Sequence, residues 1–311
     1  MIGRRTRDQG KRVLHGAFRW GQRVGVDVLP RHFYSSVPDL QALENDHSWR
    51  RPLDMTGVRG AEIDDQVRTA GEWFTPAVRD VLAGRDVHAS AVAENGADGY
   101  GPMEAQFLHA FVATRRPARV VQIGAGVSTA VILDAAAVHG LDVEVTCIDP
   151  YPTELLVRLA DEGRVTLVRE PAQTVDLATL TALGPGDLLF IDSTHTVKVG
   201  SEVNRLVLEV LPLLDPGVVV HVHDIMFPYD YPVDLLDGRL FFWGESTLLH
   251  AWLVHNQHAS ILLSQSMLAH GAADRLDDLL VGYRPAAVRD GLFDGPRGDR
   301  HFPSATWVLI D

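Results

Sequence analysis

The chain has 311 residues, of which 46% are apolar and 22% are charged, a composition typical of folded globular proteins that excludes disordered and fibrous classes. No stretch approaches the roughly 18 uninterrupted apolar residues of a membrane span, no export signal precedes the first element, and the single Cys147 cannot form an internal disulfide, so we expect a cytoplasmic protein. Its 28 basic and 41 acidic residues give a net charge of −13, which disfavours nucleic acid as a partner.

Residues 1–98 lack a regular alternation of strands and helices, and we expect them to form a helical or irregular cap or assembly segment. The segment opens with basic residues between Arg4 and Arg23. These could lie on an acidic partner or a membrane surface, or could form a solvated helix at a subunit contact. Pro- and aromatic-rich stretches at 27–38 and 48–52 could form a lid. We expect a homo-oligomer to which this segment contributes.

From residue 99 onward, short apolar runs alternate with helical stretches such as 128–139 and 200–214. This alternation is typical of a parallel sheet covered by helices on both faces. It predicts an α/β, doubly wound, mostly parallel sheet of seven strands, with the ligand outside the carboxyl ends of the strands. The predicted strands are residues 119–123, 143–148, 165–168, 187–191, 218–223, 260–264 and 305–310.

A glycine-containing turn follows the first predicted strand. Gly124 and Gly126 let the backbone approach a ligand at the start of the next helix. The third position of a dinucleotide-binding turn is Thr129 rather than glycine, which argues against a tightly held pyrophosphate. Asp149, after the second strand, could accept hydrogen bonds from ribose hydroxyls or form a turn before Pro150. Together, the turn and the acid suggest an adenosine-type ligand.

Acidic and imidazole side chains follow the fourth and fifth predicted strands. Asp192 and His195 come after the fourth strand, while His223 ends the fifth strand and Asp224 follows it. Adjacent parallel strands end at the same edge of the sheet, so two carboxylates would lie close together, an arrangement that a divalent cation relieves. Alternatively, these are solvated loop aspartates. His221 could be a hydrogen-bonded histidine of the core.

Residues 99–224 resemble the class I S-adenosylmethionine-dependent methyltransferases, especially the metal-dependent branch with catechol and macrocin-type O-methyltransferases. The resemblance implies a Rossmann-like methyltransferase domain over residues 99–311. The motifs that carry it are Gly99-Tyr100-Gly101-Pro102, Gln106-Phe107-Leu108, Val121 to Thr129, Ile148-Asp149, Phe190-Ile191-Asp192-Ser193-Thr194-His195, Leu213 to Val220 and His223-Asp224.

The resemblance also implies a role for each matching position. Asp192, His223 and Asp224 would hold Mg²⁺ or Mn²⁺, and His195 would be a general base. Because imidazole suits Zn, Fe or Mn better than Mg, His223 leaves the metal open. Gln122 stands where the family usually has an acid. The cofactor S-adenosylmethionine would contact Tyr100, Gly124, Gly126, Ser128, Asp149, Glu170 and Asp192, with Asp149 on the ribose and Glu170 near the adenine.

The activity we expect is divalent-metal-assisted O-methylation of a small polar acceptor, such as a sugar or a natural product. The cation would lower the pKa of the acceptor hydroxyl while His195 removes its proton. An aromatic loop at 227–232 could cover the acceptor, and Glu245 could reach the substrate or metal. Alternatives are metal-independent O-, N- or C-methylation, an iron-dependent hydroxylase with this fold, a cofactor-binding scaffold without catalysis and, more distantly, a nicotinamide dehydrogenase.

Overall fold

The computed structural model describes residues 4–232, 239–284, 288–289, 292–293 and 303–311. The chain divides into two compact units, Met1–Asp46 and His47–Asp311. The first unit contains the helices α1 (Arg4–Arg23) and α2 (Leu40–Asn45). Asp39 caps α2, because its carboxylate accepts a hydrogen bond from the Ala42 amide. None of the helices in the described parts combines the length and apolar content needed to cross a membrane.

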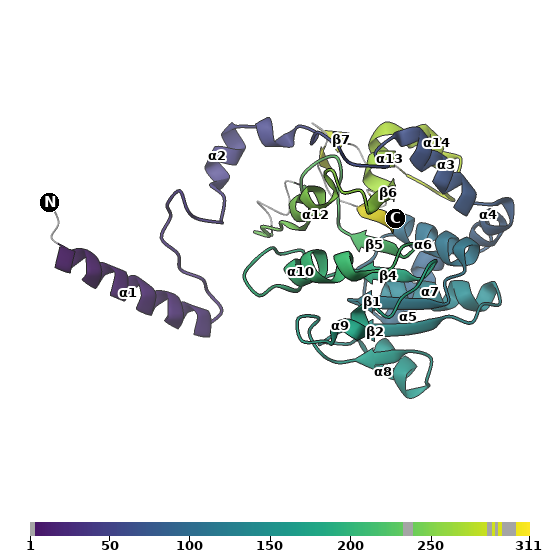
Figure 1. Ribbon diagram of the computed structural model, residues 1–311, viewed down its shortest axis with the longest axis horizontal. Coiled ribbons are helices and arrows are strands. Elements are labelled where there is room, and N and C mark those ends of the chain that lie inside the picture. The colour runs from purple at the N-terminus through teal and green to yellow at the C-terminus, as the bar shows by residue number, and fades with distance from the viewer. Residues whose placement is uncertain (1–3, 233–238, 285–287, 290–291, 294–302) are drawn as a thin grey trace. The chain divides into compact units, whose positions relative to one another are not determined.

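A seven-stranded sheet forms the centre of the second unit (Figure 1). Its order is β3-β2-β1-β4-β5-β9-β6. The first five strands in the chain are parallel, whereas β9 runs antiparallel between β5 and β6. The strands are β1 (Arg119–Ile123), β2 (Glu144–Ile148), β3 (Thr166–Val168), β4 (Leu188–Ile191), β5 (Val219–His223), β6 (Ala259–Ser264) and β9 (Ala305–Ile310). All seven predicted strands are confirmed to within one residue, and so is the mostly parallel sheet.

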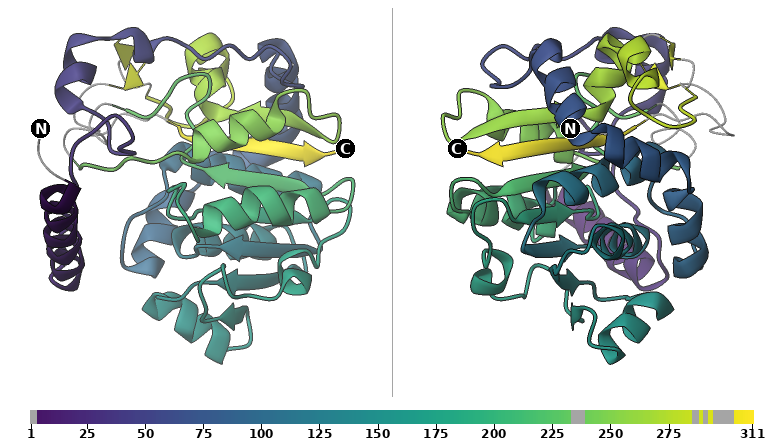
Figure 2. Two further views of the ribbon diagram at one scale, coloured as in Figure 1. Left: turned by 60° about the vertical axis from the view of Figure 1, so that its left-hand side comes forward. Right: turned by 90° about the vertical axis from the view of Figure 1, so that its right-hand side faces the viewer.

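Helices cover both faces of the sheet (Figure 2). The predicted helix at 128–139 is confirmed as α7, and the stretch at 200–214 forms α10 with two short turns of other helix types. The helical segments of this unit are η1 (Ser48–Arg50), α3 (Ile63–Trp73), α4 (Pro76–Ala83), α5 (Val87–Asn95), α6 (Pro102–Arg115), α7 (Val127–Val138), α8 (Glu154–Asp161), α9 (Leu177–Leu180), α10 (Glu202–Arg205), η2 (Leu206–Val210), η3 (Leu211–Leu213), α12 (Glu245–Leu253), α13 (Gln265–Gly271) and α14 (Ala273–Asp277). The strands β7 (Val288–Arg289) and β8 (Leu292–Phe293) pair with each other in a separate two-stranded antiparallel sheet.

Two apolar cores lie on opposite faces of the sheet. Strand β4 shows the division, because Leu188 and Phe190 enter one core while Leu189 and Ile191 enter the other. All four side chains are buried, and alternation along a strand sends successive side chains to opposite faces. Burial on both faces explains why the strands appear as continuous apolar runs in the sequence.

Helices α3 to α5 pack into the same core as the sheet. The Trp73 ring lies 5.2 Å from that of Phe111 in α6 and 5.0 Å from that of Trp307 in β9, measured between centroids. The second compact unit begins at His47, so the helices before residue 98 pack together with the sheet as part of the same unit. Where the catalytic part begins, which we placed at residue 99, stays a prediction.

Strand order places the ends of β1 and β4 at the centre of one edge. The chain runs outward through β1, β2 and β3 and then returns to β4 on the other side of β1. Such a reversal leaves a crevice at the carboxyl ends of the two strands, where ligands of open α/β sheets bind. This edge, which we call the carboxyl rim, carries the residues described next.

Candidate active site

The glycine turn joins β1 to α7 at the carboxyl rim. Gly124 has φ +75°, and a Cβ at this position would collide with the main-chain oxygen of Asp192. Its amide donates a hydrogen bond to the Ile148 carbonyl at 3.1 Å. A residue with a side chain would therefore be strained both in its backbone and against β4. Glycine at this position lets the turn lie against the end of β4.

Three polar side chains fix the underside of the turn. The Gln122 amide donates to the Ser128 hydroxyl at 3.1 Å, and the Thr129 hydroxyl donates to the Gln122 side-chain oxygen at 2.8 Å. The Gly126 amide donates to the Thr129 hydroxyl at 3.2 Å. Gln122 thus takes part in an internal network in this chain, and the Ser128 hydroxyl faces that network. Its predicted contact with a cofactor stays a prediction.

Asp149 lies beside the glycine turn, as the sequence suggested. One carboxylate oxygen accepts from the Tyr151 amide at 2.8 Å, and the other accepts from the Ala125 amide at 3.4 Å. Asp149 therefore both forms the turn after β2 and reaches the glycine turn. Asn95, which the sequence analysis did not select, lies 3.3 Å from the position of a Cβ on Gly126. Nothing in the sequence around Asn95, the last residue of α5, indicated that it would lie beside the glycine turn.

Two other predicted cofactor residues differ in exposure. Glu170 is exposed and accepts a hydrogen bond from the Thr174 hydroxyl at 3.3 Å. Tyr100 is buried, and its hydroxyl lies 3.1 Å from the ring nitrogen Nε2 of His221. Burial lowers the pKa of His221 well below its usual value. The suggestion that His221 is a hydrogen-bonded core histidine agrees with this geometry.

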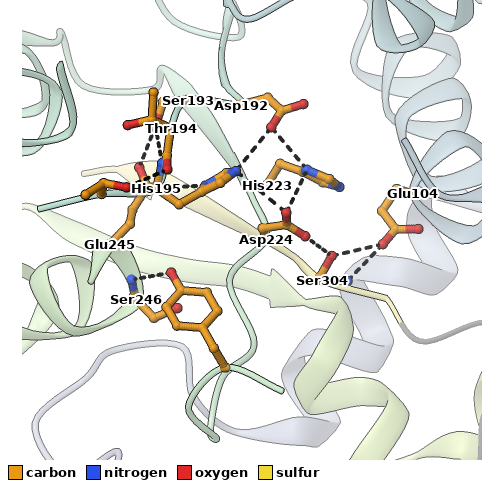
Figure 3. A network of polar contacts seen from close by, with 12 residues as sticks. Glu104, Asp192, Ser193, Thr194, His195, His223, Asp224, Glu245, Ser246 and Ser304 are labelled. Carbon is orange, nitrogen blue, oxygen red and sulfur yellow. Dashed lines mark hydrogen bonds and ion pairs between the residues drawn. The ribbon is translucent and has the colours of Figure 1, made fainter. Parts of the chain in front are cut away.

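The four residues predicted at the ends of β4 and β5 do meet at the carboxyl rim (Figure 3). His195 Nε2 lies 3.5 Å from Asp192 Oδ1 and 3.6 Å from Asp224 Oδ2. His223 Nδ1 lies 3.3 Å and 3.9 Å from the same two oxygens. Two imidazole nitrogens and two carboxylate oxygens therefore form a ring in which each nitrogen faces both oxygens. We call this ring the His–Asp cluster.

Glu245, at the start of α12, binds the other side of the His195 ring. Its Oε2 lies 2.7 Å from His195 Nδ1, and both side chains are buried, with 1% and 6% of their surface exposed. The Ser193 hydroxyl donates to Glu245 Oε1 at 3.4 Å, and the Trp243 ring packs on the imidazole at 4.5 Å between centroids. The imidazole is therefore held from both its edges and its face.

Two residues of the cluster have a strained backbone. His195 and Asp224 have φ of +57° and +53°, values that residues with a side chain seldom adopt. The amides of Gly244 and Glu245 donate to the His195 carbonyl and hold this conformation. Strained residues that the surrounding structure holds in place are typical of functional sites.

The cluster favours protonated imidazoles. Burial opposes the charge on His195, but hydrogen bonds to Asp192 and Glu245 and the charges of Glu245 and Asp224 outweigh it and raise its pKa to about 10. For His223, burial is likewise outweighed by Asp224 and Asp192, so its pKa rises to about 9. Although burial opposes the charge of Asp192, the two imidazoles hold its pKa below the usual range. The surroundings of the cluster therefore favour the protonated form of both imidazoles.

A second buried acid, which the sequence analysis missed, lies behind Asp224. Glu104 in α6 accepts a hydrogen bond from the Ser304 amide at 2.9 Å, and the Ser304 hydroxyl donates to Asp224 Oδ1 at 2.8 Å. Glu104 is buried, and burial raises its pKa. One feature of the sequence could have indicated Glu104: it is an acid within a helix whose buried residues are mostly apolar. Ser304 lies about 80 residues further along the chain than Asp224, and no local pattern relates the two.

The loop at 227–232, which we predicted to cover the acceptor, is held in place by buried side chains and a hydrogen bond. Phe227 and Tyr231 are buried, and the Tyr231 hydroxyl accepts from the Ser246 amide at 3.0 Å. Pro228 and Tyr229 line a cavity of about 570 Å³ together with residues 52–58 and part of α13. Whether this loop covers an acceptor stays a prediction.

The donor chemistry of the His–Asp cluster suits a divalent metal, because carboxylate oxygen and imidazole nitrogen are ligands of Mn, Fe and Zn. The spacing described above does not make a finished site. Within the parts of the chain that the structure describes, no three His, Cys, Asp or Glu side chains are arranged to hold a metal ion as they stand. The ring would have to lose its protons and contract around an ion.

Comparison with known proteins agrees with the fold. Residues 121–225 match the family model of a methyltransferase domain. This segment runs from β1 to just after β5 and contains the glycine turn, Asp149 and the His–Asp cluster. The similarity to a methyltransferase domain therefore covers the strands that carry the carboxyl rim and its candidate residues.

Individual relatives are distant. An uncharacterized protein of Archaeoglobus fulgidus is 24% identical over 170 residues, which are 52% of this chain and 76% of the relative. The S-adenosylhomocysteine-bound methyltransferase PaMTH1 of Podospora anserina is 14% identical, with a TM-score of 0.40 over 92% of this chain and 99% of the other. Cofactor-bound Rv0187 from MTB is 18% identical, with a TM-score of 0.44 over 74% and 92% of the two chains.

Proposed function

We propose that the enzyme methylates a hydroxyl group of a small polar acceptor, such as a sugar or a natural product, with His195 as the general base. The observation that carries the proposal is the contact between His195 and buried Glu245, at the rim where the glycine turn and Asp149 would hold the cofactor. A hydroxyl is a poor nucleophile while it keeps its proton, so O-methylation needs a positioned base. A carboxylate on Nδ1 orients the imidazole and directs Nε2 toward the rim.

The cofactor would occupy the turn side of the rim. We propose that the main chain at Gly124 and Gly126 contacts its amino-acid and ribose parts, that Asp149 accepts the ribose hydroxyls, and that Glu170 lies near the adenine. Tyr100, Ser128 and Asp192 are further candidates for contact. The cofactor's methyl group would then face the His–Asp cluster, since Asp192 touches both the glycine turn and the two imidazoles.

His195 must lose a proton before it can act as a base. Asp192 and Asp224 hold the proton on Nε2 in the arrangement described, because each carboxylate lies within 3.6 Å of that nitrogen. A positive charge beside these two carboxylates would weaken that hold and lower the pKa of His195. We propose that Asp192, His223 and Asp224 hold a divalent metal ion, which would supply such a charge and acidify the acceptor hydroxyl.

The same geometry supports transfer without a metal. Two protonated imidazoles already balance the carboxylates of the cluster, given the raised pKa values of His195 and His223. In that case His195 would first release its Nε2 proton to solvent. The acceptor hydroxyl would then replace a carboxylate contact to Nε2 and give its proton to that nitrogen as its oxygen takes the methyl group, while His223 would remain the cation. Sensitivity to a chelator separates the two forms of the proposal.

The test is a methyl-transfer assay with isotope-labelled S-adenosylmethionine and a panel of sugars, glycosides and phenols. We expect label on an acceptor oxygen, its loss in His195→Gln, and unchanged turnover in the control His258→Gln, whose side chain is exposed just before β6 begins. In Asp192→Ala, activity and the response to metal should be lost together. Label on nitrogen or carbon, or full activity in His195→Gln, would refute the proposal.

A further inference from the structure

Helix α1, in the first compact unit, has an apolar side that is exposed. Val13, Leu14 and Trp20 expose 73%, 45% and 67% of their surface. At about 100° per residue these side chains lie on one side of the helix together with Phe18. Exposed apolar side chains gathered on one helix side mark an interaction surface rather than a solvated helix.

The other side of α1 is basic. Arg12, Arg19 and Arg23 are exposed and, by the same periodicity, lie away from the apolar side, whereas exposed Lys11 lies at the border of that side beside Phe18. The helix therefore combines a strongly cationic side with an aromatic and aliphatic one, while its average hydropathy is low. These are the properties of helices that lie in the plane of a membrane surface.

Charge is distributed very unevenly along the chain. Eight of the 28 basic residues but only two of the 41 acidic residues lie between residues 4 and 31, so this segment carries +6 and the rest of the chain −19. An anionic surface would repel most of the protein and attract this segment alone. At physiological ionic strength, charges more than about 8 Å apart are screened, so local attraction by the segment can prevail.

The chain after α1 continues the same mixture. Val26, Val28 and Leu29 are about half exposed, and Phe33 and Tyr34 expose 87% and 80% of their surface. Aromatic rings and arginines together suit the headgroup layer, where one end of the side chain is apolar and the other is wet. A partner protein would need a groove shaped for these residues, whereas a lipid surface adapts to them.

We propose that α1 binds the surface of an anionic phospholipid membrane, with Val13, Leu14, Phe18 and Trp20 inserted among the headgroups and the basic side chains on lipid phosphates. The proposal is independent of the methyltransferase chemistry. Each basic residue near such a surface contributes to the attraction, so affinity falls with every charge removed and with added salt.

The experiment is co-sedimentation of the full-length protein with vesicles of phosphatidylcholine alone and of phosphatidylcholine mixed with phosphatidylglycerol. We expect binding only to the mixed vesicles and its loss in high salt. Removing three charges with Arg12→Gln, Arg19→Gln and Arg23→Gln should weaken binding about 100-fold, at several-fold per residue. Trp20→Ala should weaken it with no change of charge.

A matched control removes three exposed arginines from the second unit, Arg68, Arg158 and Arg164, by the same change to glutamine. This variant has the same net charge as the α1 variant and should bind mixed vesicles like the parent. Failure of the parent to bind, equal binding to neutral vesicles, or equal loss in both triple variants would overturn the proposal. So would a change in oligomeric state on Trp20→Ala without a change in vesicle binding, since that result assigns the apolar side to a second copy of the chain.

Discussion

The contact between Glu245 and His195 can be tested by a single isosteric change. Glu245→Gln keeps the size of the side chain but removes the charge that lies 2.7 Å from His195 Nδ1. A hydrogen bond to a charged group contributes about 1.5–3 kcal/mol, which at about 1.4 kcal/mol per pKa unit corresponds to one to two units. The pKa of His195 should therefore fall from about 10 to about 8 or 9.

The assay is an NMR titration of the protein with ¹⁵N-labelled histidine, in which the His195 resonance is identified by its absence in His195→Gln. Glu202→Gln is the matched control, because Glu202 is also buried at this edge but accepts its hydrogen bonds from the Thr194 amide and Gln173. The control should leave the pKa of His195 unchanged. An unchanged pKa in Glu245→Gln, or an equal fall in both variants, would refute the account of how His195 is held.

Three further predictions concern stability and the Asp224 contact. Gly124→Ala should destabilise the fold by about 1–3 kcal/mol, because the residue needs positive φ and lacks room for a Cβ; a thermal melt checks this, and an unchanged Tm would contradict it. Ser304→Ala should lose about 1.5–3 kcal/mol with its hydrogen bond to the Asp224 carboxylate and should also change the pH profile of methyl transfer, which a merely structural role would leave alone. The pKa values of His195 and His223 are raised above 6.5 to about 10 and 9 on folding, so their contribution to stability is complete below pH 6.5 and is lost as pH rises to about 10. Chemical denaturation across this range should show the fall, with a shallower slope in His195→Gln.

The sheet could be predicted from the sequence because each strand is a separate apolar run. Strand β4, for example, is buried along its whole length, and the glycine turn after β1 marks where a strand gives way to a helix. The position of β9 could not be read in this way, since antiparallel insertion between β5 and β6 depends on pairing between segments about 85 residues apart. Periodicity describes single elements and not their neighbours.

The candidate site was predictable where strand order alone brings residues together. Asp192, His195, His223 and Asp224 lie at or just after the ends of adjacent parallel strands, so their convergence followed from topology. With the usual imidazole pKa near 6.5, His195 was expected to act as a base near neutral pH. In the structure the surrounding carboxylates raise this pKa and favour the protonated form. Glu104 and Ser304 could not be placed, because one is inside a buried helix and the other precedes the last strand.

The central claim, that this chain binds S-adenosylmethionine at the carboxyl rim, is tested most directly by titration calorimetry of the purified protein with that cofactor. The titration is repeated with EDTA and with added Mn²⁺ or Mg²⁺, and with Asp149→Ala as a variant of the proposed ribose contact. We predict micromolar binding by the parent protein and clearly weaker binding by the variant. No heat of binding under any of these conditions, or equal affinity in Asp149→Ala, would contradict the account.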